Sequence, residues 1–274
     1  MEKISVFGGT GFIGSAFVKK YHDKCTAIPR DVRQAPTDNV LYLISTVDNY
    51  NVFTDITLDV RTNLITLLET LEHCKRDNVV FNFVSSWFVY GTCKLPATEE
   101  TPCHPMGFYS ITKHTAEQLL VSFCETFNVK YRILRLGNIY GAGDLKTSRK
   151  KNAIQFMVSQ IAENQPVELY EGGDVVRDLL HIDDTVRAIH LVIEHGELNT
   201  IYNIGSGEPT YLRDVIDIAV KLTDSKSKIS SIPTPDFHKQ VQAKDFYLNT
   251  AKLTSLGFKQ LISLEDGIRS LLRK

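Results

Sequence analysis

The stretch ISVFGGTGFIG, residues 4–14, places a short apolar run directly before a glycine-rich turn. Its three glycines follow the spacing GxxGxxG, and residues 12–21 continue with the apolar spacing of a helix. Glycines at such places allow a tight turn and let the backbone approach a pyrophosphate at the helix N-terminus. The order of strand, glycines and helix predicts a dinucleotide-binding loop that comprises Gly8, Gly11, Phe12, Ile13 and Gly14.

Beyond this loop, short apolar runs alternate with amphipathic stretches. The apolar runs at residues 40–45, 79–85 and 131–136 are typical of buried strands. Residues 56–74 and 109–127 carry apolar side chains at helical spacing. Strands that are apolar throughout occur in parallel sheets with helices on both faces. We therefore predict an α/β fold, a Rossmann-type doubly wound parallel sheet.

The alternation loosens after residue 140, which indicates a second part of the chain. We expect a dinucleotide-binding domain over residues 1–140, to which later elements at about 173–205 return. Residues 141–274 are expected to form mainly a smaller, discontinuous C-terminal substrate lobe. The polar segment from Ser225 to His238 contains two prolines, and we expect it to be a loop.

Composition argues against several classes of partner. The 31 basic and 32 acidic residues give a net charge of -1 without a basic block, which disfavours nucleic acid and anionic membranes as partners. No apolar run approaches the roughly 20 residues that cross a bilayer, and the start MEKISVF has no apolar signal core. The 5 cysteines form no CxxC pair and the 8 histidines are scattered, so we expect a reduced cytoplasmic protein without a metal site.

The end of the second expected strand bears on which dinucleotide binds. An acidic residue there accepts from the ribose hydroxyls of NAD, whereas an arginine suits the 2′-phosphate of NADP. In AIPRDVR, Arg30, Asp31 and Arg33 compete for this position. We place Arg30 at the strand end, which favours NADP, and Asp31 in that position would favour NAD.

The stretch YSITK places Tyr109 and Lys113 one helical turn apart. An ammonium and the positive ring of a nicotinamide would lower the pKa of the tyrosine, which could then act as an acid and base. The preceding stretch SSWFVYG supplies Ser85 and Ser86 at the end of an apolar strand. Because ligands bind at the carboxyl ends of parallel strands, we expect these groups to converge. A solvent-exposed tyrosine and lysine pair on a helix is the alternative.

Together these motifs make the sequence resemble the extended short-chain dehydrogenase/reductase family of nucleotide-sugar epimerases, dehydratases and reductases. The resemblance spans nearly the whole chain and also rests on LRLGNIYGAGD, RDLLHIDD and YNIGSGEPTYLRDVI. It implies that Tyr109 is the catalytic acid and base and that Lys113 lowers its pKa and binds the nicotinamide ribose. It implies further that Ser86 is the catalytic serine and that Ser85 lies near the cofactor.

The same resemblance assigns Asn138 and Arg177 to the diphosphate of a nucleotide-sugar substrate, whose sugar Ser86 would contact. A guanidinium binds phosphate oxygens through two parallel hydrogen bonds, and an amide adds directional donors. For Arg177 the alternative is an ion pair with Asp174 or Asp178.

The sequence departs from the family in two places. Dehydratases of the family have Asp-Glu directly after the catalytic serine, where this chain has Trp87 and Phe88, so a 4,6-dehydratase is disfavoured. The two rings either line the sugar pocket or pack in the core. Only DVRQAPTDN, residues 31–39, separates the second strand from the third, so part of the wall around the adenosine is missing and the cofactor should exchange more easily.

Three functions remain open on these grounds. The first is an NADP(H)-dependent reductase of a nucleotide-linked 4-keto-6-deoxy sugar. The second is a nucleotide-sugar 4-epimerase, similar to UDP-glucose 4-epimerase, with tightly held NAD. The third is a non-catalytic dinucleotide-binding protein. The resemblance also implies a homodimer formed through the helices at residues 56–74 and 109–127.

Overall fold

The computed structural model of the chain describes residues 3–143 and 153–272. Its largest sheet contains β1 (Ile4–Phe7), β2 (Cys25–Ile28), β3 (Asn39–Tyr42), β4 (Val80–Ser86), β5 (Lys130–Leu136) and β9 (Thr200–Ile204). All six strands are parallel, in the order β2-β1-β3-β4-β5-β9. The predicted Rossmann-type sheet is confirmed.

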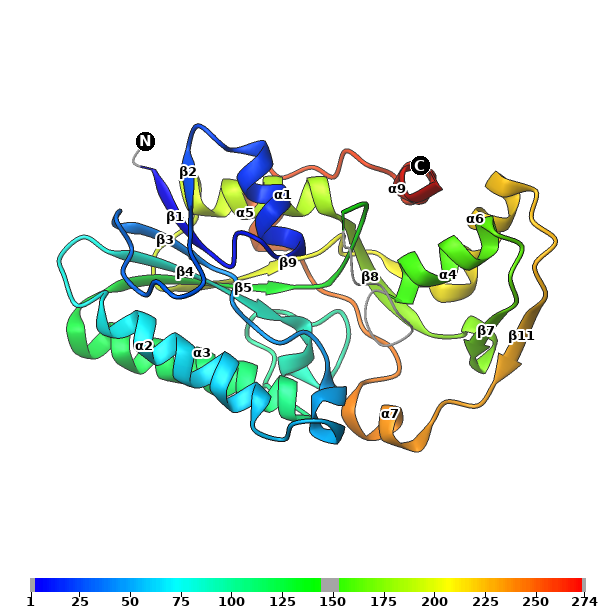
Figure 1. Cartoon of the computed structure of the whole chain (residues 1–274), viewed down its shortest axis with the longest axis horizontal. Helices are drawn as coiled ribbons and strands as arrows, with labels where there is room; N and C mark the ends of the chain where they lie inside the picture. Colours follow the sequence, from blue (N-terminus) through cyan, green and yellow to red (C-terminus); the bar gives the residue numbers. More distant parts are fainter. Residues whose placement is uncertain (1–2, 144–152, 273–274) are drawn as a thin grey trace.

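Helices cover both faces of this sheet (Figure 1). α1 (Phe12–Lys20) and α5 (Ile182–His195) lie on one face. α2 (Thr66–Glu72) and α3 (Phe108–Phe127) lie on the other. β9 is the last strand of this sheet, beside β5, and α5 covers one of its faces. Both come later in the chain than the first elements of the second lobe.

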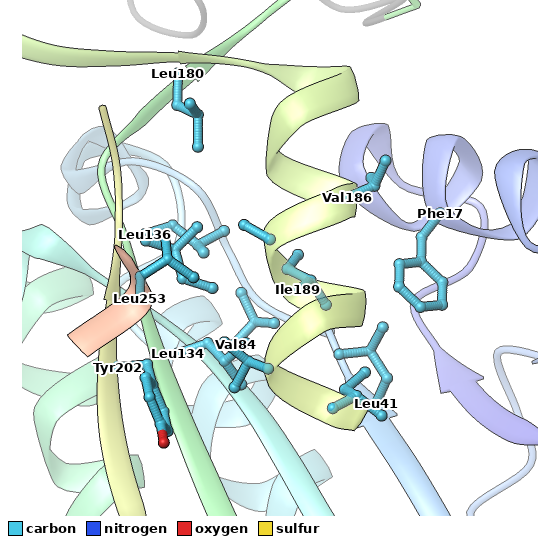
Figure 2. Packing of buried hydrophobic residues seen from close by; sticks show 14 of the residues in the cluster. Phe17, Leu41, Val84, Leu134, Leu136, Leu180, Val186, Ile189, Tyr202 and Leu253 are labelled. Carbon is cyan, nitrogen blue, oxygen red and sulfur yellow. The ribbon is translucent and has the colours of Figure 1, made fainter. Parts of the chain in front are cut away.

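The apolar core between α5 and the sheet explains why the strands are apolar throughout (Figure 2). Ile189 of α5 points toward the strands that carry Leu134 (β5) and Leu41 (β3), and Val186 lies on the side of α5 that faces Phe17 of α1. All five side chains are fully buried. Burial of a side chain of this size contributes about 1.5–3 kcal/mol, so this layer holds the sheet rigid beneath the site at its carboxyl edge.

The helix predicted for residues 56–74 is interrupted. A π-helical segment, η2 (Val60–Ile65), precedes α2. In this region Asn63 accepts a hydrogen bond of 2.9 Å from the backbone N–H of Thr46, and the Thr46 hydroxyl bonds to Asp59. Apolar spacing gives no sign of such buried polar anchors, which is why it predicted a regular helix.

The connection from β2 to β3 contains no helix, as the brevity of the sequence predicts. β2 is consequently an edge strand. Arg76 donates hydrogen bonds of 3.1 and 2.7 Å to the carbonyl oxygens of Ala35 and Thr37, and the Thr37 hydroxyl bonds to Ser5 of β1 at 2.7 Å. The short connection is thus held against the sheet by polar contacts.

The second lobe combines two small sheets with a layer of helices on the right of Figure 1. One sheet has the order β10-β8-β6 and the other pairs β11 with β7. These strands are β6 (Asn138–Tyr140), β7 (Val167–Tyr170), β8 (Val176–His181), β10 (Pro209–Tyr211) and β11 (Ile229–Ile232). The helices of this lobe in the described residues are α4 (Ala153–Ala162), η4 (Glu171–Gly173), α6 (Leu212–Thr223), α7 (Asp236–Val241) and α9 (Leu264–Leu272), whereas α8 (Ala251–Ser255) packs beside β9 of the large sheet. α4, α6 and α9 share one apolar core with β7.

The expectation of a loop from Ser225 to His238 is wrong in part. The segment contains β11, which pairs in parallel with β7, and the start of α7. β11 has no fully buried side chain, so it needs few apolar residues and its sequence ISSI gives a weak strand signal.

Candidate active site

The glycine loop joins β1 to α1 and leaves the first turn of that helix open. Gly8 has a φ of +78°, in the left-handed region that favours glycine. A Cβ atom on Gly14 would lie 2.2 Å from the carbonyl oxygen of Gly8, so the loop closes only around a glycine. Gly11 is the N-cap of α1 and supplies no side-chain cap, while Phe12 and Ile13 turn into the core. The first-turn N–H groups therefore remain available to the pyrophosphate of a dinucleotide.

Of the three charged residues that follow β2, one is already paired. Arg33 forms an ion pair of 2.9 Å with Glu69 of α2 and donates to the backbone oxygen of Arg30. The side chains of Arg30 and Asp31 are exposed, and within residues 3–143 and 153–272 neither makes a hydrogen bond or ion pair. Arg30 and Asp31 are thus the two that stay free to meet a ribose or its phosphate.

β4 carries two adjacent serines to the carboxyl edge of the sheet. Ser85 Oγ is buried and has no hydrogen-bond partner among the described residues. A buried hydroxyl without a partner costs about 1–3 kcal/mol, so a ligand that supplies the missing bond would be favoured here. Ser86 is the N-cap of a 3-10 turn, η3 (Trp87–Tyr90), and accepts from the N–H of Phe88 at 3.4 Å.

The start of α3 packs against this end of β4. Tyr109 and Lys113 are only 8% and 2% exposed, so the alternative of a solvated helix face is wrong. The phenol of Tyr109 lies near the hydroxyl of Ser86, which favours its ionised form. The ammonium of Lys113 donates a 2.7 Å hydrogen bond to the carbonyl oxygen of Val84 and lies 4.1 Å from the centre of the Phe83 ring. The structure brings the serine and the tyrosine close together. The lysine, on α3, is held against β4 by its bond to Val84.

Desolvation dominates the electrostatics of this group. Burial raises the pKa of Tyr109 to about 12, although hydrogen bonds with Ser86 and Ser45 act in the opposite direction. Without a cofactor, desolvation thus outweighs the neighbouring groups, and the lowering expected from Lys113 together with a nicotinamide ring stays a prediction. Burial likewise lowers the pKa of Lys113 to about 7, against the effect of Glu117, which raises it. A tyrosine with so high a pKa is protonated at neutral pH and can donate a proton.

The two aromatic residues after Ser86 have different positions. Trp87 is buried and stacks on Phe246, with ring centroids 4.6 Å apart and an interplanar angle of 26°. Phe88 is partly exposed and packs edge-on against Tyr109, with centroids 5.6 Å apart. Trp87 is thus a core residue, whereas Phe88 borders the phenol. Neither side chain can transfer a proton.

Asn138 and Arg177 lie at the start of β6 and in β8, on the side of the second lobe. Asn138 Oδ1 is buried and lacks a hydrogen-bond partner among the described residues, so it is available to a ligand. The guanidinium of Arg177 lies 5.5 Å from the centre of the Trp87 ring. It donates to the carbonyl oxygens of Val176, at 2.7 Å, and of Lys244.

The alternative ion pairs of Arg177 are not formed. Asp174 pairs with Arg213 at 2.8 Å and Asp178 accepts from backbone N–H groups, including that of Leu248 at 3.1 Å. Burial lowers the pKa of Arg177 to about 10, against the opposing effect of Asp245. A desolvated arginine without a carboxylate in direct contact gains strongly from an anionic ligand such as a phosphate.

Two residues at the site were not predicted from the sequence. Ser45 lies near the phenol of Tyr109, whose ionised form it favours, and donates to Asn63 Oδ1 at 3.1 Å. Asn49 accepts a 3.1 Å hydrogen bond from the backbone N–H of Tyr109. Ser45 ends the apolar run of residues 40–45, so its place after a parallel strand was the available signal. Asn49 gave no local signal.

Neither a membrane span nor a metal cluster is found in residues 3–143 and 153–272. No helix there combines the length and the apolar character that a bilayer requires. No three His, Cys, Asp or Glu side chains there are grouped so that they could hold a metal ion.

Comparisons with known proteins agree with this geometry. The model of the NAD dependent epimerase/dehydratase family matches residues 29–205. A dTDP-glucose 4,6-dehydratase of Haemophilus influenzae is 28% identical over 100% of this chain and 97% of its own. A GDP-6-deoxy-D-mannose reductase of Pseudomonas aeruginosa is 23% identical over 99% of this chain and 96% of its own. The solved structure of UDP-glucose 4-epimerase from Thermotoga maritima, with UDP-glucose, shares the fold with a TM-score of 0.87, at 23% identity, over 98% of this chain and 97% of that chain.

Proposed function

Because the chain belongs to the NAD-dependent epimerase/dehydratase family, we propose that it reduces a nucleotide-linked 4-keto-6-deoxy sugar with NADPH. The observation that carries the proposal is the burial of Ser86, Tyr109 and Lys113 together, where the start of α3 packs on the end of β4 and Lys113 is bonded to Val84. Reduction of a ketone needs a proton donor, and a tyrosine with a pKa of about 12 is in the donating form at neutral pH. The membership also agrees with the resemblance to extended short-chain dehydrogenase/reductases.

The chain's own residues would divide the work as follows. When bound, a nicotinamide cofactor supplies the hydride for the carbonyl carbon. Tyr109 donates its proton to the sugar oxygen as negative charge develops there, and Ser86 orients that oxygen with its hydroxyl. Lys113 places positive charge near the resulting phenolate. Trp87 and Phe88 offer no acid or base for loss of water, which disfavours a dehydratase despite the 28% identity to one.

The substrate's diphosphate would lie between Asn138 and Arg177. Asn138 would direct the N–H groups of its amide to the phosphate oxygens, and Arg177 presents a guanidinium whose pKa is lowered by burial. Arginine and amide donors suit a diphosphate, and the family's members act on nucleotide sugars. These features support a nucleotide-sugar substrate and leave the base and the sugar open.

Incubation with NADPH and a panel of nucleotide 4-keto-6-deoxy sugars tests the proposal. We expect loss of NADPH absorbance with at least one of them and formation of the corresponding 4-hydroxy sugar. If none of the sugars is reduced, the proposed reaction is wrong.

A nucleotide-sugar 4-epimerase is the second candidate, and the position of Asp31 favours it. Asp31 is exposed beside Arg30 at the end of β2, where a carboxylate would accept from the ribose hydroxyls of NAD. Two results would favour the epimerase over the reductase. The protein would copurify with stoichiometric NAD, and it would interconvert UDP-glucose and UDP-galactose without added cofactor.

The cofactor preference can be tested at Arg30. We expect Arg30→Ala to raise the Kd of NADPH about tenfold or more and to leave that of NADH nearly unchanged, because a charged hydrogen bond to the 2′-phosphate is lost. Fluorescence titration measures both constants. Arg33→Ala is the matched control, since Arg33 is paired with Glu69. Equal Kd values of NADPH for wild type and Arg30→Ala would reject Arg30 as the phosphate ligand.

A homodimer is proposed from an exposed apolar surface on η2, α2 and α3. Side chains on this surface include Ile65, Leu68 and Ile111, which are 47%, 40% and 47% exposed. We expect Leu68→Glu to halve the mass measured by light scattering, because a charge would be buried in the interface. Leu198→Glu, at a 44% exposed leucine elsewhere, is the control and should remain a dimer. A wild-type monomer would contradict the proposal.

A further inference from the structure

Asn49 connects the catalytic helix with the second lobe. It is the first residue of a 3-10 turn, η1 (Asn49–Phe53), and is 5% exposed. Its Oδ1 accepts a hydrogen bond of 3.1 Å from the backbone N–H of Tyr109. Its Nδ2 donates to the carbonyl oxygen of Val241, the last residue of α7, at 3.4 Å. One amide thus bonds to both elements.

Gly107 provides the space for this connection. It is the N-cap of α3 and has an ordinary extended φ of -140°. A Cβ atom on Gly107 would lie 2.3 Å from Asn49 Oδ1 and 3.1 Å from Val241 Cβ. The glycine is therefore required by close approach and not by its backbone conformation. Gly107 has no side chain that could accept a hydrogen bond from the first turn of α3. Asn49, from another part of the chain, provides this acceptor for the N–H of Tyr109.

Aromatic contacts strengthen the same junction between η1 and α7. Phe237 of α7 packs edge-on against Tyr50 and Phe53, with ring centroids 5.2 and 4.6 Å apart. The Tyr50 hydroxyl lies 3.4 Å from Nδ1 of His238. Phe53 remains 67% exposed, so this contact is made at the surface and can change without loss of the core.

The segment after α7 reaches the proposed diphosphate site. The carbonyl oxygen of Lys244, three residues beyond Val241, accepts from the guanidinium of Arg177. A continuous path of contacts therefore leads from Arg177 through Lys244 and α7 to Asn49 and on to the backbone of Tyr109. In Figure 1, α7 occupies the bottom of the view, between the second lobe and the first.

We propose that Asn49 is a positioning residue that couples the second lobe to the catalytic tyrosine. This proposal rests on the proposed function. An amide suits the place because it accepts from Tyr109 and donates to Val241 at the same time. Capping by Asn49 fixes the first turn of α3 and therefore the position of the Tyr109 phenol. The bond to Val241 fixes this turn relative to the lobe that would bind the substrate's diphosphate. A shift of α7 on substrate binding is passed to Tyr109 by this one side chain.

Amide hydrogen exchange tests the coupling without any substrate. We expect Asn49→Ala to accelerate exchange of the Tyr109 N–H roughly fivefold to tenfold, as for loss of a helix cap. Asn49→Asp keeps the acceptor and loses the donor, so it should accelerate exchange in α7 and leave Tyr109 protected. Phe237→Ala, which removes the ring contacts with Tyr50 and Phe53 of η1, should accelerate exchange at residues 107–110 as well as in α7. Phe127→Ala at the far end of α3 is the control and should leave residues 107–110 unchanged.

Kinetics then separate positioning from mere stability. We expect Asn49→Ala to lower kcat about tenfold while the Kd of NADPH stays unchanged, because Asn49 does not touch the glycine loop. Faster exchange confined to α7 in Phe237→Ala would overturn the coupling. If exchange is coupled but no nucleotide sugar is reduced, the proposed function fails and the coupling stands.

Discussion

Replacement of Tyr109 by phenylalanine should abolish turnover, with a fall in kcat/KM of about a thousandfold or more. The change removes one oxygen, which is the proposed proton donor and lies near the hydroxyl of Ser86. The ring itself stays in place, packed against Phe88. Because the variant leaves the glycine loop and Arg30 unchanged, the Kd of NADPH should change little. Rate measurements with the sugar that the wild type reduces, and a cofactor titration, give both values.

Tyr131→Phe is the matched control for this change. Tyr131 lies near the start of β5, at the opposite end of the strands from Ser86, and its loss of a hydroxyl should leave kcat/KM unchanged. Circular dichroism would show that both variants are folded. If Tyr109→Phe retains more than a tenth of the activity, the tyrosine is not the acid. The surviving alternatives would then include a protein that keeps the dinucleotide fold without this chemistry.

The parts of the site that follow from the sequence are those fixed by short spacing within regular elements. Gly8, Gly11 and Gly14 lie in one turn between a strand and a helix, so their order predicts the loop directly. Tyr109 and Lys113 share a helix face for the same reason. Ser86 meets them because strand ends in a parallel sheet share one edge, which is a property of topology and needs no coordinates.

Burial and side-chain partners chosen across the fold could not be predicted in this way. The desolvation that raises the pKa of Tyr109 comes from its burial in the fold, which local sequence does not reveal. Asn49 bonds to Tyr109 of α3 and to Val241 of α7, which lie 60 and 192 residues further along the chain. The position of Trp87 beneath Arg177 likewise joins η3 and β8. Such contacts leave no periodic trace in the sequence.

The second large effect is expected at Lys113, because burial makes the charged form of this side chain unfavourable. The ammonium has one backbone partner, Val84, and the face of Phe83, and burial lowers its pKa from 10.5 to about 7. In the unfolded chain the same lysine keeps its ordinary pKa. Between these two values the unfolded chain binds more protons than the folded one, so the free energy of unfolding rises with pH. Tyr109 does not interfere, since it titrates above pH 10 in both states.

We expect Lys113→Met to lower kcat/KM about a hundredfold and to remove this pH dependence. In the wild type, the Lys113 contribution should make the free energy of unfolding about 2 kcal/mol larger at pH 9 than at pH 7. In the variant that increment should vanish, while loss of the bond to Val84 lowers stability equally at both pH values. Denaturant titrations at the two pH values measure the difference, with Lys130→Met as a control that should keep the wild-type slope. The same slope in wild type and Lys113→Met would mean that Lys113 stays fully charged in the folded protein, and its proposed role beside the phenolate would then rest on Coulomb attraction without a desolvation cost.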